Sequence, residues 1–160
     1  MQKKIADGLG ETKLIRITKN MDSKEVPEYV ERIGILTPVY KGNIPSMVQE
    51  FLNDLQFQSI PYIFSIATCD AMEVNTHTSI RKIIEQKNCS VSSSFTILRP
   101  ASNMTRRSPY SKEKQSKMIK QSHYDISIIL PMTGTNLFMQ KIAVLVVVSV
   151  RKYVRLIILN

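Results

Sequence analysis

Apolar residues in the first 100 positions form short unbroken runs that alternate with stripes at helical spacing. The run from Ile33 to Leu36 is typical of a strand buried on both faces. Gly42 and Asn43 then favour a tight turn, and Pro45 suits the first turn of a helix. The next apolar positions fall on one helical face: Met47, Val48, Phe51, Leu52 and Leu55. The pattern therefore predicts a strand, a turn and a helix over residues 33–55.

Similar patterns continue on both sides of this unit. Strands are predicted over Thr12–Thr18, Ser59–Thr68 and Cys89–Leu98. Asn75 or Thr76 is expected to cap a helix whose sheet-facing residues are Ile80, Ile83 and Ile84. Two further helices are expected, over Gln2–Leu9 and from Ser111 to about Lys120. Strands alternating with helices indicate an α/β fold with a parallel sheet, and ligands bind at the carboxyl edge of such sheets.

Two of the predicted strands end in loops with a distinctive sequence. The first carries Pro38-Val39-Tyr40, followed by Pro45 and the helical run Glu50-Phe51-Leu52. The second ends in Thr68-Cys69. In this order and spacing, the two loops resemble a family of bacterial and archaeal flavoproteins that join a flavodoxin-like domain to a ferredoxin-type iron–sulfur domain. The resemblance covers about residues 1–130.

The resemblance implies a flavodoxin-like three-layer sandwich that binds FMN and carries electrons, rather than an enzyme with its own substrate. Tyr40 would stack on the flavin, although the alternative of a tyrosine that only covers the sheet edge is equally open. Asp70 stands where the family often has glycine, and Cys69 fits a small buried residue better than a redox thiol. The implied flavin contacts are Thr37, Pro38, Val39, Tyr40, Gly42, Thr68, Cys69 and Asp70.

Compared with this family, the chain starts after the first strand and after the Ser/Thr/Gly-rich loop that wraps the flavin phosphate. We therefore expect a truncated domain over residues 1–103 and a helical linker over residues 104–130. We also expect FMN to bind weakly, because backbone N–H groups of that loop normally hold the phosphate.

Residues 131–160 do not fit the family, which places its iron–sulfur cysteines there. Back-translation of residues 132–159, read in a shifted frame, allows the C-x₂-C-x₂-C-x₃-C-P run of a bacterial ferredoxin. The four cysteines fall at the codon boundaries entering Val144, Val147, Val150 and Val154. We hypothesise a frameshift near residue 130 that leaves an out-of-register tail over residues 131–160, with no iron–sulfur cluster in this chain. The alternative is a genuine valine-rich strand.

The missing first strand would lie between the strands at Thr12–Thr18 and Ile33–Leu36, because the flavodoxin-like order is 2-1-3-4-5. Ala143–Val150 is β-branched, uncharged and apolar on both faces, as a central strand requires. One expectation is that this segment fills the gap or pairs with an exposed edge. Otherwise the Thr12–Thr18 strand stays loose or pairs directly with the next one, and the tail is disordered or drives aggregation. Exposed edges also allow self-association.

The net charge of +9 is concentrated near the end of the sequence, since residues 101–160 carry 10 Lys and Arg but only 2 Asp and Glu. A basic tail that binds nucleic acid or an acidic surface is thus a third functional hypothesis, after the electron carrier and an inactive frameshifted product. We do not expect nucleic-acid binding, because solvated lysines on a helix are the more common reason for such a charge. The redox partner is not identified by the sequence.

Other features favour a cytoplasmic protein without a metal. The chain has only two cysteines and no apolar signal core at its start, and its longest apolar run, Ile142–Val150, is far short of the ~20 residues that span a bilayer. His77 and His123 are separate from each other and from other ligand-type residues, so a surface or capping role is expected for both.

Overall fold

The computed structural model describes residues 12–18, 30–57, 59–70, 72–99, 111–134 and 143–148. The predicted helix at Gln2–Leu9 lies outside them. In chain order the elements are β1 (Thr12–Ile17), β2 (Arg32–Pro38), α2 (Ser46–Asp54), β3 (Tyr62–Cys69), α3 (Thr76–Glu85), β4 (Val91–Leu98), α4 (Lys112–Gly134) and β5 (Ala143–Val148).

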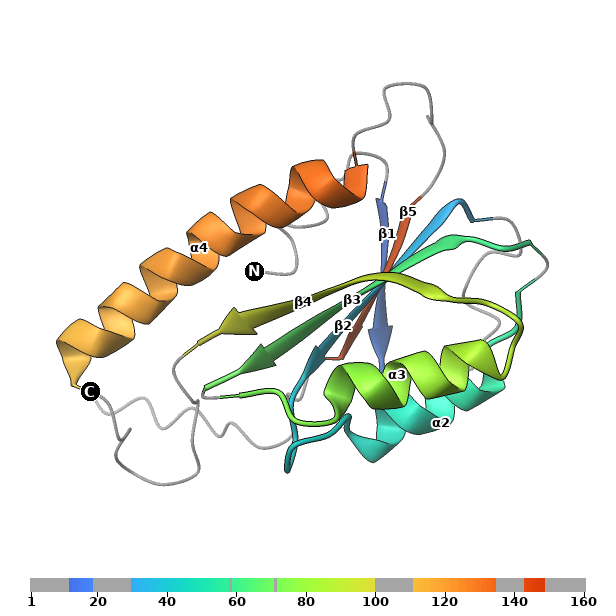
Figure 1. The fold of residues 1–160 in the computed structure, drawn as a ribbon, viewed down its shortest axis with the longest axis horizontal. Helices are drawn as coiled ribbons and strands as arrows, with labels where there is room; N and C mark the ends of the chain where they lie inside the picture. The colour runs from blue at the N-terminus through green and yellow to red at the C-terminus, as the bar shows by residue number, and fades with distance from the viewer. Residues whose placement is uncertain are drawn as a thin grey trace.

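The strands form one sheet in the order β1-β5-β2-β3-β4, and every pairing is parallel. Helices α2 and α3 cover one face of this sheet, and α4 lies over the other (Figure 1). The predicted α/β fold with a parallel sheet is therefore confirmed. Since all strands run the same way, their carboxyl ends meet at one edge, where the loops after β2 and β3 emerge.

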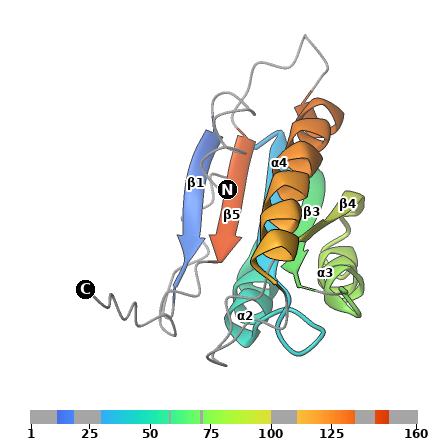
Figure 2. The ribbon, with the colours of Figure 1, turned by 90° about the vertical axis from the view of Figure 1, so that its left-hand side faces the viewer.

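The segment at Ala143–Val148 is the central strand between β1 and β2, and Figure 2 shows β5 beside β1. Val146 is level with Ile15 on one side and with Ile35 on the other. Of the two expectations for this tail, the structure adopts the first, in which it fills the gap. The spatial order matches the doubly wound order 2-1-3-4-5, but its second position is occupied by a strand from the far end of the chain.

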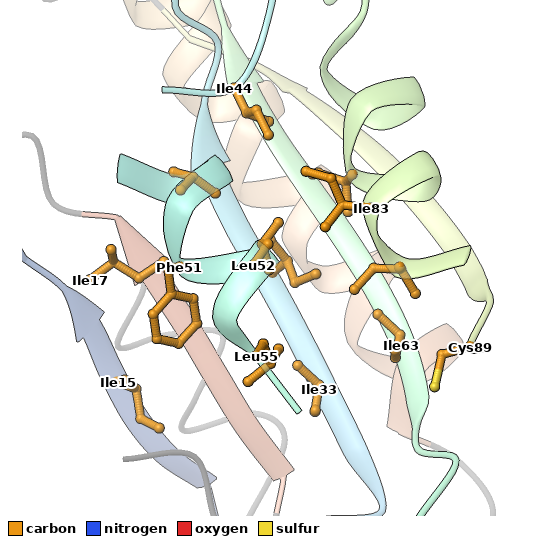
Figure 3. Packing of buried hydrophobic residues seen from close by; sticks show 14 of the residues in the cluster. Ile15, Ile17, Ile33, Ile44, Phe51, Leu52, Leu55, Ile63, Ile83 and Cys89 are labelled. Atoms are coloured by element: carbon orange, nitrogen blue, oxygen red, sulfur yellow. The ribbon is translucent and has the colours of Figure 1, made fainter. Parts of the chain in front are cut away.

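The main core lies between the sheet and the two helices α2 and α3, where apolar side chains converge from both layers (Figure 3). The apolar face predicted for α2 is buried there through Val48, Phe51 and Leu52. The face predicted for α3 is buried through Ile80, Ile83 and Ile84. Their partners in the sheet include Ile15, Ile17, Ile33, Ile35 and Ile63.

Several boundaries differ from those predicted. β3 starts at Tyr62 rather than Ser59, because Pro61 has no N–H to donate to a neighbouring strand. α4 begins after Ser111, whose hydroxyl accepts from the Lys114 N–H at 3.2 Å, as expected for a cap. Its end was predicted wrongly, since the helix continues past Lys120 to Gly134. The β-branched residues after 125 and Pro131 have low helix propensity, which hid this extension.

Candidate functional site

The loop after β2 is a closed two-residue turn that presents Tyr40. The Tyr40 N–H donates to the Asn43 carbonyl at 2.8 Å, and the Asn43 N–H donates back to the Tyr40 carbonyl at 3.0 Å. Lys41 and Gly42 between them both have positive φ, +50° and +75°, as in the turns that close β-hairpins. The Tyr40 side chain remains 54% exposed. The turn thus holds an aromatic ring at the carboxyl edge with most of its surface available for stacking.

This turn is tied to the loop after β3. The Val39 N–H donates to the Thr68 carbonyl at 2.9 Å, which continues the pairing of β2 with β3 by one residue. In turn, the Arg99 N–H donates to the Cys69 carbonyl at 2.7 Å. The ends of β2, β3 and β4 are therefore held together as one edge, toward which their arrowheads point in Figure 1.

The turn also rests against the start of α3. The Asn75 N–H donates to the Gly42 carbonyl at 2.8 Å. A Cβ atom built on Gly42 would lie 3.4 Å from the Val74 side chain, which is ordinary contact, so space does not forbid a side chain there. The backbone conformation of Gly42 is the stronger constraint, because a φ of +75° is costly for residues with a Cβ atom.

We expect Gly42→Ala to lower the free energy of unfolding by about 1 kcal/mol, through strain at positive φ. Lys41→Gly is the matched control, because Lys41 already occupies the left-handed region at a cost that glycine would remove. Denaturant unfolding should therefore show opposite signs for the two variants. If both variants destabilise the protein equally, the positive φ of Lys41 is not a source of strain in the turn.

The eight residues predicted to contact a flavin all come from these two neighbouring strand ends. Thr37, Pro38, Val39, Tyr40 and Gly42 belong to the end of β2 and its turn, whereas Thr68, Cys69 and Asp70 end β3. They differ in access: Thr37 is only 1% exposed, and its hydroxyl donates to the Pro38 carbonyl at 3.1 Å. Cys69 and Asp70 are half-buried. The Lys41 ammonium lies 5.8 Å from the centre of the Tyr40 ring and adds positive charge beside it.

A polar cluster beneath the start of α3 was missed by the sequence reasoning. His77 Nδ1 lies 2.8 Å from Ser65 Oγ, and His77 Nε2 lies 3.1 Å from Thr96 Oγ1. Ser65 Oγ also donates to Ser94 Oγ at 3.0 Å. Ser65 was a signal of this cluster in the sequence, because it is the one hydroxyl residue in the otherwise apolar run Ile63–Ala67. A hydroxyl that is buried with such a run needs a hydrogen-bond partner.

The hydrogen bonds of this cluster define how the imidazole is protonated. Ser65 has one hydroxyl proton, which it donates to Ser94, so His77 Nδ1 must carry a proton and donate to Ser65. In the neutral ring, Nε2 then accepts from the Thr96 hydroxyl. Burial of the ring lowers the pKa of His77 and outweighs the nearby Glu73 carboxylate, which raises it. The surroundings of His77 therefore favour neutral imidazole.

The N-cap of α3 is Asn75, one of the two predicted residues, although its side chain makes no capping hydrogen bond. Instead the Glu73 carboxylate accepts from the His77 N–H at 2.8 Å. The predicted position of the cap is therefore confirmed, and the side-chain hydrogen bond at this helix start comes from Glu73. Because Glu73 already places a negative charge at this helix N-terminus, a phosphate group would be repelled there.

The part of the chain that the structure describes holds no group of three or more His, Cys, Asp or Glu arranged to bind a metal ion. No helix within it has the length and apolar character that a membrane crossing needs. The chain matches no protein-family model, and no curated protein is significantly similar to it.

Proposed function

We propose that the carboxyl edge formed by the loops after β2 and β3 binds the ring of FMN, and that the protein is a flavodoxin-like electron carrier or the remnant of one. The observation that carries this proposal is the exposed Tyr40 ring in a turn closed at 2.8 and 3.0 Å and joined to the β3 loop. A rigid, solvent-facing aromatic ring suits the flat and largely apolar isoalloxazine. The resemblance of the loops after β2 and β3 to those of the flavoprotein family indicates a flavin as the expected ligand.

The fit of FMN to this edge is partial. Tyr40 can stack on the ring, and Lys41 beside it adds a positive charge. Among the described residues, however, the N-terminus of α3 is occupied by the Glu73 carboxylate, which disfavours the phosphate. When bound, the flavin would supply the electron-transfer chemistry, and the protein would tune its potential through stacking and hydrogen bonds.

We expect FMN to bind at least about a thousandfold more weakly than it binds to a protein with a complete phosphate loop. Such loops form several charge-assisted hydrogen bonds worth roughly 1.5–3 kcal/mol each. Quenching of flavin fluorescence measures the dissociation constant, and riboflavin, which has no phosphate, should bind about as well as FMN. Submicromolar FMN binding, or a strong preference for FMN over riboflavin, would contradict this part of the proposal.

Tyr40→Ala tests the ring contact itself, and we expect it to weaken riboflavin binding by roughly tenfold, in line with the ~1–3 kcal/mol of aromatic stacking on a base. Tyr124→Ala is the matched control, because Tyr124 is similarly exposed but lies on α4. Equal riboflavin binding by both variants would show that Tyr40 does not contact the flavin. Absence of any flavin binding by the unmodified protein would favour the alternative of a frameshifted product without activity.

We also propose a cytoplasmic location, because the thiols of Cys69 and Cys89 are not joined in a disulfide and suit a reducing compartment. We do not propose that the basic tail binds nucleic acid, because solvated lysines are the more common reason for such a charge. Salt-sensitive retention on nucleic acid would revive that alternative.

A further inference from the structure

The hydroxyl of Thr96 is the exposed end of a chain of hydrogen bonds that leads into the core. Thr96 lies on β4 and is exposed, and its Oγ1 is 3.1 Å from His77 Nε2. The other ring nitrogen of His77 lies 2.8 Å from the Oγ of Ser65, which is fully buried. The chain therefore joins a solvent-facing hydroxyl to a base, and the base to a buried group that orients it. Hydrolases and acyl transferases activate a hydroxyl nucleophile with the same arrangement.

We propose that Thr96 is a nucleophile that accepts an acyl group from small activated esters, with His77 as its general base and Ser65 as a positioning residue. The Thr96 Oγ1 attacks the ester carbonyl carbon, and its proton passes to His77 Nε2. The tetrahedral intermediate then expels the leaving alcohol, which takes the proton from the ring, and an ester remains on Thr96. Attack by water, with the same proton transfers, releases the carboxylic acid and restores the hydroxyl.

The hydrogen bonds of the cluster give the ring of His77 the tautomer that this step needs. Ser65 donates its only hydroxyl proton to Ser94, at 3.0 Å, so it accepts from His77 Nδ1. In the neutral ring, Nε2 then has a lone pair directed at the Thr96 hydroxyl. A base must lie within hydrogen-bond reach of the proton that it removes, and 3.1 Å meets this condition.

The charges around His77 suit a general base. Burial has the largest effect and lowers the pKa of the ring, which keeps it in the neutral form that can accept a proton. The Glu73 carboxylate and the Phe95 carbonyl act in the opposite direction, and Arg81 lowers the pKa again. Because Glu73 and Phe95 favour the protonated ring, they stabilise the imidazolium that forms when Thr96 gives up its proton.

The backbone N–H of Thr96 lies outside the ladder of hydrogen bonds between β3 and β4. The Arg99 N–H donates to the Cys69 carbonyl of β3. Because the N–H groups of a strand point alternately to its two sides, that of Ile97 also faces β3, whereas that of Thr96 faces away. β4 is the last strand of the described sheet, so no described strand pairs with it there. In serine proteases the N–H of the nucleophile itself helps to stabilise the oxyanion. A single such donor is a weak oxyanion hole, which is why we restrict the substrates to activated esters.

The test uses p-nitrophenyl acetate and the full chain at neutral pH. Surface lysines also react with this ester, so the acetyl group is located by proteolysis and mass spectrometry rather than by the release of p-nitrophenol alone. We expect Thr96 to be acetylated at least about a hundredfold faster than Thr18, because general-base catalysis contributes roughly 10²–10⁴-fold. Thr18 is the internal reference, since it is also exposed but follows β1 at the opposite edge of the sheet.

Three variants make the test specific. Thr96→Ser keeps the hydroxyl and should keep the reaction, whereas Thr18→Val changes an exposed threonine elsewhere and should leave the labelling of Thr96 unchanged. His77→Gln removes the base and should slow the acetylation of Thr96 by about a hundredfold. If His77→Gln does not fold, the ratio of rates at Thr96 and Thr18 in the unmodified protein still decides. Equal rates at these two threonines, or an unchanged rate at Thr96 in folded His77→Gln, would overturn the proposal.

The positioning role of Ser65 has a spectroscopic readout. Nitrogen NMR shifts of the His77 ring distinguish its two neutral tautomers, and we expect the form with the proton on Nδ1 in the unmodified protein. Ser65→Ala removes the acceptor of this proton, so we expect a mixture of tautomers and several-fold slower acetylation of Thr96. A purely structural role would lower the melting temperature and leave the tautomer unchanged, which would contradict this part of the proposal. No readout involves a flavin, so the result is independent of the proposed function.

Discussion

Removal of residues 143–160 is expected to unfold most of the protein, whereas removal of residues 151–160 alone should leave the sheet intact. The reason is the place of β5, which pairs with β1 on one side and with β2 on the other. Without it, β1 loses its neighbour in the described sheet, and Ile15 and Ile17 lose their fixed position under α2. Each buried isoleucine contributes roughly 1.5–3 kcal/mol, a large part of the 5–15 kcal/mol that typically stabilises a domain.

Circular dichroism and thermal unfolding of the two truncated chains measure this difference. The shorter chain should lose its cooperative transition, and the chain that ends at residue 150 should keep it. In the full-length monomer, hydrogen exchange should also show strong protection of the amides from Val146 to Val148, since a central strand is hydrogen-bonded on both sides. Rapid exchange of these amides in a monomeric sample would exclude the insertion of this strand.

The place of β5 in the sheet does not reveal the origin of the tail. A frameshift near residue 130 would make the sequence of Ala143–Val148 an accident, yet this segment has the β-branched and uncharged character of a central strand. A valine-rich segment suits such a strand whichever reading frame encodes it. The placement of β5 is therefore the same whether or not a frameshift produced this segment. Sequencing of the gene tests the frameshift separately. In the shifted frame, we expect four cysteine codons and a following proline codon in the DNA that encodes residues 142–159.

The features that were predicted best from the sequence are those that depend on residues close together in the chain. The strand at Ile33–Leu36, the turn at Gly42 and the apolar face of α2 each follow from local period or from backbone preference. The place of β5 was predicted as one of two outcomes, because composition shows that a segment can be a central strand but not which strands it pairs with. The position of Tyr40 at the carboxyl edge followed from the parallel sheet.

The polar cluster was missed because it depends on the register between strands. Ser65 meets Ser94 because β3 and β4 pair with one residue inserted near Ile63, and no local pattern reveals that offset. Once the register is set, the hydroxyls of Ser94 and Thr96 face the same side as Ser65, and His77 on α3 closes the cluster. The cap by Glu73 was missed because a long carboxylate side chain reached the helix from an unexpected position. His77 looked separate in the sequence, yet in the folded chain its ring contacts both Ser65 and Thr96.

The cluster and the turn both depend on α3 being fixed to the sheet, and Ile80→Ala tests this attachment. Ile80 is fully buried between α3 and the sheet, and we expect its truncation to cost about 2–5 kcal/mol, because a cavity adds to the lost transfer energy. For a chain of this length the melting temperature should fall by roughly 10 °C.

Ile119→Ala is the matched control for Ile80→Ala, because it makes the same change in a helix at a position that is 39% exposed. Both variants gain the same helix propensity, so the difference between their free energies of unfolding isolates burial. We expect Ile119→Ala to change that free energy by less than about 1 kcal/mol. Similar losses for the two variants would mean that α3 is not packed on the sheet as described. In that case neither the support of Gly42 by Asn75 nor the bridge of His77 between β3 and β4 could form.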